Sequence, residues 1–245
     1  MSQSQSQSRS NHRYTDAHRY IAQKFLLFGP ATRKDLTRFI TEAAQKTKTD
    51  LGTTDQDLVQ IVQSINAKLI PLNLRIQRAN DEINGQACYV LLNSNVREII
   101  DWKTNYTDKE LDFIAKTLSA MARNNDRLLT LPEIQQIAVD CKISMNDWHR
   151  VICELKESAY LSSEFVIDRE VYRFGVRLIA EMYEDMANRF EDVLPNCASC
   201  KRLIFTVSEA KDCSKCNEQS QYHIHCLKKG VKQGGLSCES CKTPF

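Results

Sequence analysis

Residues 197–241, CASCKRLIFTVSEAKDCSKCNEQSQYHIHCLKKGVKQGGLSCESC, decide how the end of this chain folds, because they hold seven of its ten cysteines at regular spacing. These cysteines and one histidine form four pairs, each separated by two residues: Cys197-Cys200, Cys213-Cys216, His223-Cys226 and Cys238-Cys241. Such a pair presents two ligands from one turn to a tetrahedral Zn²⁺, so four pairs fill two closed structural sites. No coordination position remains open for a catalytic water.

The segment 195–245 is too short to build a large hydrophobic core, so metal binding would supply most of its folding free energy, about 10 kcal/mol per site. The alternative is a disulfide framework or a set of ordinary buried thiols. The start of the chain, MSQSQSQSRSNHRY, lacks the apolar region of a secretory signal. We therefore expect a reducing compartment, where disulfides are rare, and we predict a small zinc-bound finger over residues 195–245.

His225 competes with His223 for the position of the histidine ligand. His225 is adjacent to Cys226, and neighbouring residues reach one metal ion less easily than residues separated by two others. We therefore favour His223.

Length and composition predict a multidomain protein without a membrane span. The 245 residues exceed the roughly 100 to 150 of a typical domain, so we expect two or three compact units. No apolar run approaches the ~18 to 20 residues that a membrane helix requires. The net charge of +2 gives no strong reason to expect tight, sequence-independent binding of nucleic acid. Residues 1–13 alternate Ser and Gln and are predicted to be a disordered tail.

Residues 14–100 are predicted to form three helices and a β-hairpin. Each helix begins at a threonine that can cap it, and the second and third have an aspartate three residues further on. These residues are Thr15, Thr32 with Asp35, and Thr54 with Asp57. From residue 72 the apolar period changes to two, Asn84-Gly85 supplies a turn, and a second strand follows at 88–92. Three helices followed by a hairpin indicate a winged-helix domain.

Residues 105–194 repeat this order. The expected helix starts are Thr107 with Glu110, Pro132-Glu133, and Ser144 with Asp147. A weaker hairpin follows at 165–174, and then one longer helix with apolar residues at intervals of four, Leu178, Met182, Met186 and Phe190. The predicted fold class is therefore mainly α with small β-hairpins: two tandem winged-helix domains followed by the zinc-bound finger.

The remaining cysteines and two further histidines show no pattern typical of catalysis. Cys88, Cys141 and Cys153 lie in apolar patterns, where a free cysteine acts as a small hydrophobe, so we expect them in the core. His18 and His149 have no carboxylate, serine or cysteine partner that sequence spacing identifies. We expect them to be surface or packing residues.

Two winged helices followed by a finger with four cysteines, one histidine and three cysteines in that order resemble the non-structural maintenance of chromosomes element 1 family. This family provides the RING-bearing subunit of the SMC five/six complex. Three stretches before the finger also resemble family stretches: 15-TDAHR-19, 89-YVLLN-93 and 108-DKELD-112.

The resemblance implies that the finger is a variant RING that cross-braces two Zn²⁺ ions. The first ion would be held by Cys197, Cys200, His223 and Cys226, and the second by Cys213, Cys216, Cys238 and Cys241. PHD fingers share this order of ligands but carry a tryptophan shortly before the last pair, and residues 231–237 contain none. That difference argues against a reader of histone tails.

The resemblance further implies a nuclear, chromosome-associated E3 ubiquitin ligase that acts in DNA repair and recombination. Its winged helices would bind a MAGE-type partner and sit with a kleisin subunit on the SMC heads. A RING positions a ubiquitin-charged conjugating enzyme and needs no catalytic residue of its own. Leu203, Ile204 and Lys242 are the candidate contacts to that enzyme or to ubiquitin. We expect low activity in the chain alone and higher activity with the MAGE-type partner.

Two other functions compete with the ligase. One is a non-enzymatic assembly scaffold, in which the finger is a zinc-stapled docking surface in the same complex. The other is a winged-helix transcription factor, which requires a basic recognition helix. Residues 58–69 offer only Lys68, and the basic residues of 147–157 are opposed by acidic ones. We therefore expect protein partners, with DNA contact at most weak or indirect.

Overall fold

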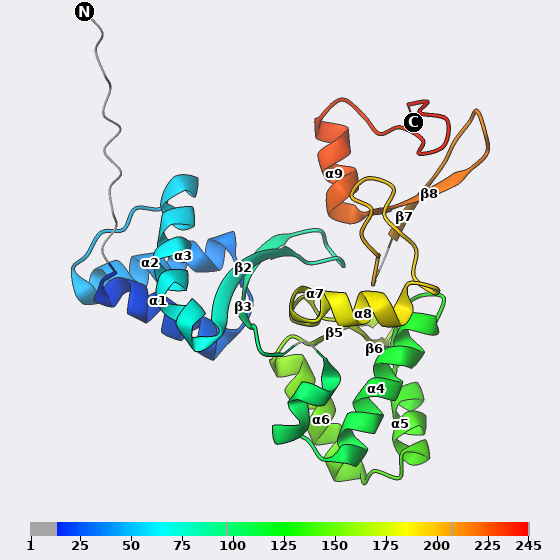
Figure 1. The fold of residues 1–245 in the computed structure, drawn as a ribbon, viewed down its shortest axis with the longest axis horizontal. Helices are drawn as coiled ribbons and strands as arrows, with labels where there is room; N and C mark the ends of the chain where they lie inside the picture. The colour runs from blue at the N-terminus through cyan, green and yellow to red at the C-terminus, as the bar shows by residue number, and fades with distance from the viewer. Residues whose placement is uncertain (1–13, 97, 207, 245) are drawn as a thin grey trace, which may run out of the picture.

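A computed structural model describes residues 14–96, 98–206 and 208–244. The predicted tail at residues 1–13 lies outside the described residues. Within them the chain forms a helix-rich first unit, a second unit of similar order, and a C-terminal finger of mostly irregular backbone (Figure 1). No helix in the described ranges is long and apolar enough to cross a membrane.

The first unit confirms the predicted helices and hairpin. Thr32 caps one helix by accepting a hydrogen bond from the N–H of Asp35 at 3.2 Å, and Thr54 and Asp57 repeat this arrangement. Gly29 ends the first helix at φ 68°, a positive φ that glycine adopts without strain. The elements are α1 (Asp16–Phe28), β1 (Ala31–Thr32), α2 (Arg33–Thr47), α3 (Asp55–Leu69), η1 (Ile70–Leu72), β2 (Leu74–Asn80) and β3 (Ala87–Asn93). The short strand β1 was not predicted; it pairs with β3 and makes a three-stranded sheet of order β1-β3-β2.

The second unit has the same succession of helices and strands. Its sheet again has a short first strand beside the last one, in the order β4-β6-β5. The register pairs Leu129 with Tyr172 and Leu161 with Phe174. All four side chains lie in the same hydrophobic core. The elements are η2 (Ile99–Thr104), α4 (Asp108–Arg123), β4 (Leu129–Thr130), α5 (Leu131–Asp140), α6 (Met145–Glu157), β5 (Leu161–Val166) and β6 (Arg169–Phe174).

The predicted long helix after the second hairpin is two helices, α7 (Val176–Glu181) and α8 (Tyr183–Phe190). The break lies at Met182, whose backbone at φ −114° and ψ 22° leaves the helical region. Hydrogen bonds still run from Met182 N–H to the Leu178 carbonyl and from Met186 N–H to the Met182 carbonyl. The apolar side chains therefore stay on one buried face, which is why their spacing gave no sign of the break.

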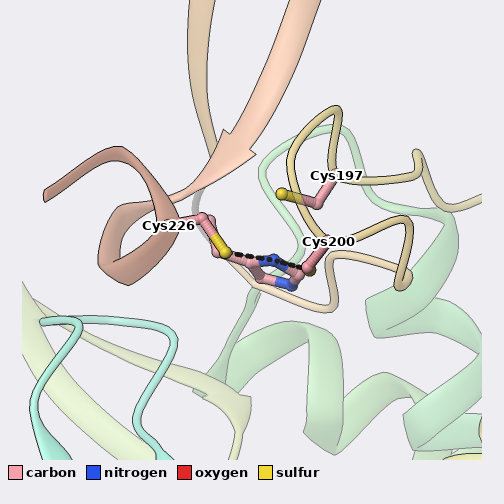
Figure 2. Close-up of side chains that lie close together, drawn as sticks. Cys197, Cys200 and Cys226 are labelled. Atoms are coloured by element: carbon pink, nitrogen blue, oxygen red, sulfur yellow. Dashed lines mark hydrogen bonds between the residues drawn. The ribbon is translucent and has the colours of Figure 1, made fainter. Parts of the chain in front are cut away.

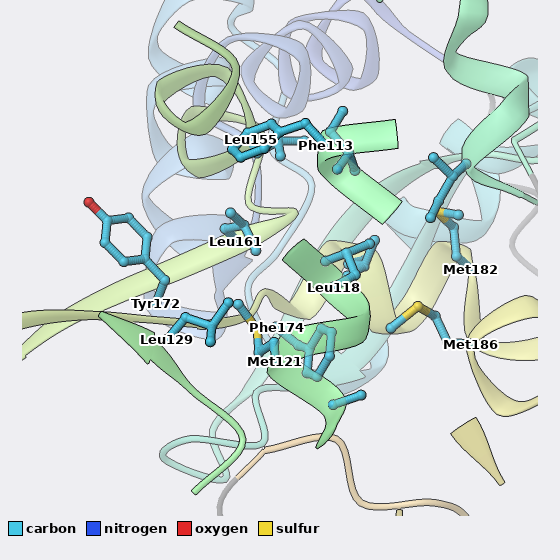
Figure 3. Packing of buried hydrophobic residues seen from close by; sticks show 14 of the residues in the cluster. Phe113, Leu118, Met121, Leu129, Leu155, Leu161, Tyr172, Phe174, Met182 and Met186 are labelled. Carbon is cyan, nitrogen blue, oxygen red and sulfur yellow. The ribbon is translucent and has the colours of Figure 1, made fainter. Parts of the chain in front are cut away.

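The largest core belongs to the second unit and extends into the finger. Aromatic and aliphatic side chains from α4, the β4-β6-β5 sheet and the α7–α8 segment meet there (Figure 3). Phe205 of the finger joins this core, with its ring edge-on to Phe174 at 6.0 Å and to Tyr183 at 5.7 Å between centroids. The finger is thus packed on the second unit by the same apolar burial that stabilises that unit.

The first unit contacts the second through one face of its sheet. Cys88, Val90 and Leu92 of β3 are buried against Val176 and Ala180 of α7. The buried carboxylate of Glu181 accepts a hydrogen bond from the backbone N–H of Asn93 at the end of β3. The hairpin β2–β3 extends from this contact toward the finger (Figure 1).

The finger consists of a hairpin, one helix and three cysteine turns. The strands β7 (Ser208–Asp212) and β8 (Gln219–His223) pair antiparallel, and α9 (Ile224–Lys232) follows directly. Among the described residues, the hydrophobic cluster that belongs to the finger itself has four buried members, Cys197, Ile204, Tyr222 and Cys226.

Replacing Phe113 tests the importance of the second unit's core. Phe113 of α4 is 0% exposed, so Phe113→Ala should lower the free energy of unfolding by about 3 to 5 kcal/mol. Val139→Ala on α5 is the control, because this residue is 61% exposed and the change should stay within about 0.5 kcal/mol. Urea titration followed by circular dichroism measures both. Equal effects of the two variants would contradict the assigned core.

Candidate metal centre

The finger gathers seven cysteines and one histidine into two groups of four. The ligand atoms within each group all lie within 4.8 Å of one another. The first cluster is Cys197, Cys200, His223 and Cys226, and the second cluster is Cys213, Cys216, Cys238 and Cys241. This is the interleaved grouping that the family resemblance implies, and it brings together all eight residues of the predicted ligand sets.

The three Cys-x2-Cys pairs share one backbone geometry. The residue four positions after the first cysteine donates its N–H to that cysteine's carbonyl, at 2.8 Å for Lys201, 2.8 Å for Asn217 and 3.0 Å for Lys242. These three residues all have positive φ, of 63°, 55° and 58°. The tight turn places both thiols of a pair on one side of the backbone, as two ligands of one ion require.

The first cluster combines a turn with a strand end and a helix. Cys197 and Cys200 lie on the turn after α8, His223 is the last residue of β8, and Cys226 lies in the first turn of α9 (Figure 2). Nδ1 of His223 lies 3.4 Å from Sγ of Cys200 and 4.0 Å from Sγ of Cys226. The ring therefore presents Nδ1 to the sulfurs.

The distances in both clusters suit a tetrahedral ion. With Zn–S bonds near 2.3 Å, two sulfurs of one tetrahedron lie about 3.8 Å apart. In the second cluster the Cys213–Cys241 and Cys216–Cys238 sulfur pairs are each separated by 3.5 Å. All of these cysteines are free thiols. Soft sulfur and imidazole donors without carboxylate ligands favour Zn²⁺ over harder cations, so the residues fit the predicted ion.

The thiols of Cys200 and Cys241 have lowered pKa values, whereas burial raises the pKa of Cys226 to about 11. Burial would raise the pKa of Cys200, but hydrogen bonds with His223 and with the backbone of Arg202 lower it to about 6. The hydroxyl and backbone of Thr243 likewise lower the pKa of Cys241 to about 6. Burial would lower the pKa of His223, but hydrogen bonds with Cys200 and Glu82 raise it to about 12. Binding a metal through these atoms would release the shared protons, because the ligand forms are thiolate and neutral imidazole.

The second nitrogen of the His223 ring faces away from the sulfurs. Nε2 lies 3.1 Å from the backbone carbonyl oxygen of Leu203 and 3.3 Å from a carboxylate oxygen of Glu82. Glu82 belongs to the turn between β2 and β3 of the first unit. Sequence reasoning missed this residue, because nothing in the pattern around residue 82 indicates a contact with a site more than a hundred residues further on.

His225 stacks on His223 with a centroid distance of 4.9 Å and belongs to neither cluster. Its Nδ1 atom is buried and has no hydrogen-bond partner among the described residues. The structure thus places His223, and not His225, among the sulfurs.

Two of the three candidate contacts to a conjugating enzyme are buried. Leu203 is 4% exposed and packs in the core of the second unit, and Ile204 is 0% exposed in the core of the finger. Both side chains take part in intramolecular packing, and little of either is exposed to a partner in this structure. Lys242 is exposed, and its positive φ comes from the turn of the last cysteine pair.

The other cysteines and histidines are placed mostly as expected. Cys88 and Cys141 are buried, and His18 is 1% exposed in a contact with Thr15 at the start of α1. Cys153 is an exception, because it is exposed on α6, with its sulfur 3.7 Å from Nδ1 of His149 one helical turn away. The apolar neighbours of Cys153 in the sequence concealed that it lies on the outer face of its helix.

Exchanging each histidine for alanine tests which one binds metal. We expect the wild-type chain to contain one zinc ion per cluster and His223→Ala to lose zinc from the first cluster, because three ligands no longer close the site. His225→Ala is the matched control and should keep the wild-type zinc content. Elemental analysis of the purified proteins measures both. A loss of zinc in the His225 variant alone would reverse the assignment.

Comparison with known proteins gives a consistent result. The profile of a family described as "Nse1 non-SMC component of SMC5-6 complex" matches residues 18–165. "Non-structural maintenance of chromosomes element 1 homolog" of Bos taurus is 21% identical over 216 residues, which are 88% of this chain and 78% of the relative. "Non-structural maintenance of chromosomes element 1" of Schizosaccharomyces pombe is 20% identical over 232 residues, or 94% of this chain and 92% of the relative.

A solved structure shares the fold. One chain of a solved "Nse1-Nse3-Nse4 complex" superposes with a TM-score of 0.73 at 19% identity, covering 95% of this chain and 97% of the other. The family profile matches more than half of the chain and agrees with the resemblance carried by the cysteine order. The chain belongs to the family of Nse1 non-SMC components of the SMC5-6 complex.

Proposed function

We propose that this protein is a RING-type E3 ubiquitin ligase subunit of an SMC five/six chromosome-maintenance complex. The observation that carries the proposal is the interleaving of two four-residue clusters in the C-terminal finger of a chain from this family. Because the ligand pairs of the two clusters alternate along the chain, their order supports the cross-braced arrangement of a RING. Two successive, independent zinc fingers would each use neighbouring pairs.

Two tandem winged helices at residues 14–100 and 105–194 precede the finger in this proposal. Support comes from the shared order of the two units, each with a short strand between its first two helices and a hairpin after its third. Their sheet orders, β1-β3-β2 and β4-β6-β5, are also equivalent.

The finger's proposed role is to hold two proteins in a reactive orientation. Zn²⁺ in both clusters would stabilise the fold and supply no chemistry, because each cluster already offers four ligands. A conjugating enzyme charged with ubiquitin docks on the finger, and the rate gain comes from orientation of the thioester. Lys242 projects from the last cysteine turn and would donate a hydrogen bond to ubiquitin. No residue of the chain forms a covalent intermediate.

An exposed ion pair also connects the turns of the two ligand clusters. Lys201 in the turn of the first cluster forms an ion pair with Glu239 in the last turn of the second cluster. This ion pair connects the two turns, which the hairpin β7–β8 also links.

Protein partners fit the surface of the first unit better than DNA does. Large apolar side chains are exposed at the end of α1 and in η1: Leu26, Leu27, Phe28, Ile70 and Leu72. Exposed apolar groups of this kind are typical of protein interfaces. We propose a MAGE-type and a kleisin subunit as the partners, by analogy with the solved Nse1-Nse3-Nse4 complex that shares this fold. A place in the nucleus on chromosomes, with a role in DNA repair and recombination, follows from that assembly.

A second candidate function is a non-enzymatic scaffold in the same complex. The burial of Leu203 and Ile204 favours it, because these side chains serve packing and are withdrawn from any docking surface. The finger would then be a zinc-stapled part of the assembly surface, without ubiquitin transfer.

Substitution of Lys242 distinguishes the ligase from the scaffold. In the complex with a MAGE-type partner, Lys242→Ala should slow discharge of ubiquitin from a charged conjugating enzyme by about 10- to 150-fold. A hydrogen bond from a charged group is worth about 1.5 to 3 kcal/mol, and 1.36 kcal/mol corresponds to a tenfold change in rate. Single-turnover discharge followed on gels measures the rate.

Lys211→Ala on β7 is the matched control, because it removes another exposed lysine of the finger without touching the last cysteine turn. Lys242→Arg should retain much of the activity, because it keeps the cation. If the wild-type complex with both zinc sites filled discharges no ubiquitin with any conjugating enzyme, the scaffold is the correct function.

A further inference from the structure

Glu82 is a buried acidic residue of the first unit, and its side chain contacts the finger. It follows β2 in the turn to β3, and the residue is 6% exposed. Internal hydrogen bonds close the turn around it: the N–H of Gly85 donates to the Asp81 carbonyl at 2.8 Å, and a carboxylate oxygen of Asp81 accepts from the N–H of Ile83 at 2.8 Å.

Both carboxylate oxygens of Glu82 are occupied by groups of the finger. Oε2 accepts hydrogen bonds from the backbone N–H of Phe205 at 2.8 Å, the N–H of Thr206 at 3.0 Å and the hydroxyl of Thr206 at 3.3 Å. Oε1 faces Nε2 of His223 at 3.3 Å. A buried carboxylate is costly unless such donors surround it, so the site is arranged around this side chain.

The orientation of His223 follows from this contact. A proton on Nε2 can be donated to the Glu82 carboxylate and the Leu203 carbonyl, which leaves the lone pair of Nδ1 directed at the sulfurs of the first cluster. Histidine ligands generally donate their second ring N–H to a carboxylate or a carbonyl, and this partner fixes the tautomer and makes the ligand more basic.

We propose that Glu82 is a positioning residue for His223, so that metal binding at the first cluster depends on contact between the β2–β3 turn and the finger. The proposal rests on metal binding by the first cluster and is independent of ligase activity.

Further contacts hold the turn against the segment that carries two ligands. Nζ of Lys228 in α9 donates to the carbonyl of Asn84 at 2.9 Å. Gly85, at φ 70°, lies so close to the start of α9 that a Cβ there would be 3.0 Å from Ile224 and 3.1 Å from the backbone nitrogen of His225. The turn is therefore fitted to residues 223–226, and not merely near them.

The dependence must operate in both directions. If the contact increases metal affinity at the first cluster by some factor, the metal strengthens the contact by the same factor. Filling the first cluster would thus fasten the first unit to the finger, although the two are separated by the whole second unit in the sequence.

Metal affinity of the full-length chain tests the proposal. We expect Glu82→Gln and Glu82→Ala to bind metal at the first cluster about 10- to 100-fold more weakly, the usual effect of losing such a partner. Competition with a chromophoric chelator gives the affinity. Cobalt(II) separates the two clusters, because a site with three sulfurs and one nitrogen absorbs differently from a site with four sulfurs. The second cluster should be unchanged.

Two controls separate positioning from general loss of structure. Glu191→Gln changes an exposed glutamate and should bind like the wild type. The side-chain carbonyl of Gln at position 82 can still accept from Phe205 and Thr206, so hydrogen exchange at those amides should remain slow while metal affinity falls. Removing metal from the wild type should speed exchange in residues 81–86.

Three outcomes would overturn the proposal. Wild-type affinity at the first cluster in both Glu82 variants would show that the contact does not act on His223. Equal loss at both clusters would show that Glu82 only stabilises the finger. A wild-type chain that binds no metal at the first cluster would remove its basis, whereas absence of ubiquitin transfer would leave the proposal intact.

Discussion

The finger has too little apolar surface to fold by itself, and the rest of the C-terminal architecture depends on that constraint. Four buried residues form its own core, and two of them are cysteines of the first cluster. The hairpin β7–β8 and the helix α9 carry or adjoin ligand pairs that lie together, residues 197–200 with 223–226 and residues 213–216 with 238–241. In a segment of this size, a metal ion bound by each group would supply the stability that a hydrophobic core supplies in larger domains.

The finger is also packed into the body of the protein. Phe205 enters the core of the second unit, and the Leu203 N–H donates to the hydroxyl of Tyr183 at 3.2 Å. Two buried glutamates also connect the units by hydrogen bonds. Glu82 joins the first unit to the finger, and Glu181 joins β3 to α7. Buried carboxylates need nearly complete hydrogen bonding, so they define the relative positions of the units more strictly than apolar contact alone.

Helices and hairpins were predictable because their signals are local. Capping pairs such as Thr54 with Asp57 lie three residues apart and act within one helical turn, and the structure has the helices where these pairs place them. Features that depend on contacts between distant residues were missed. The strands β1 and β4 are only two residues long and exist because β3 and β6 offer them an edge. The exposure of Cys153 and the burial of Leu203 likewise depend on neighbours far away in the chain.

By itself, the sequence determined where the capped helices start, the repeated order of the two units and the pairing of cysteines at ligand spacing, because each rests on intervals of a few residues. The tertiary structure decided which pairs meet: the second and fourth pairs share a cluster although the third lies between them. It also decided that His223 turns Nδ1 toward the sulfurs, since the Glu82 carboxylate that faces Nε2 comes from another unit. The spacing of two ligand residues decides whether one turn can present both to the same ion. Which turns meet depends on how the units pack, because the turns are far apart in the sequence.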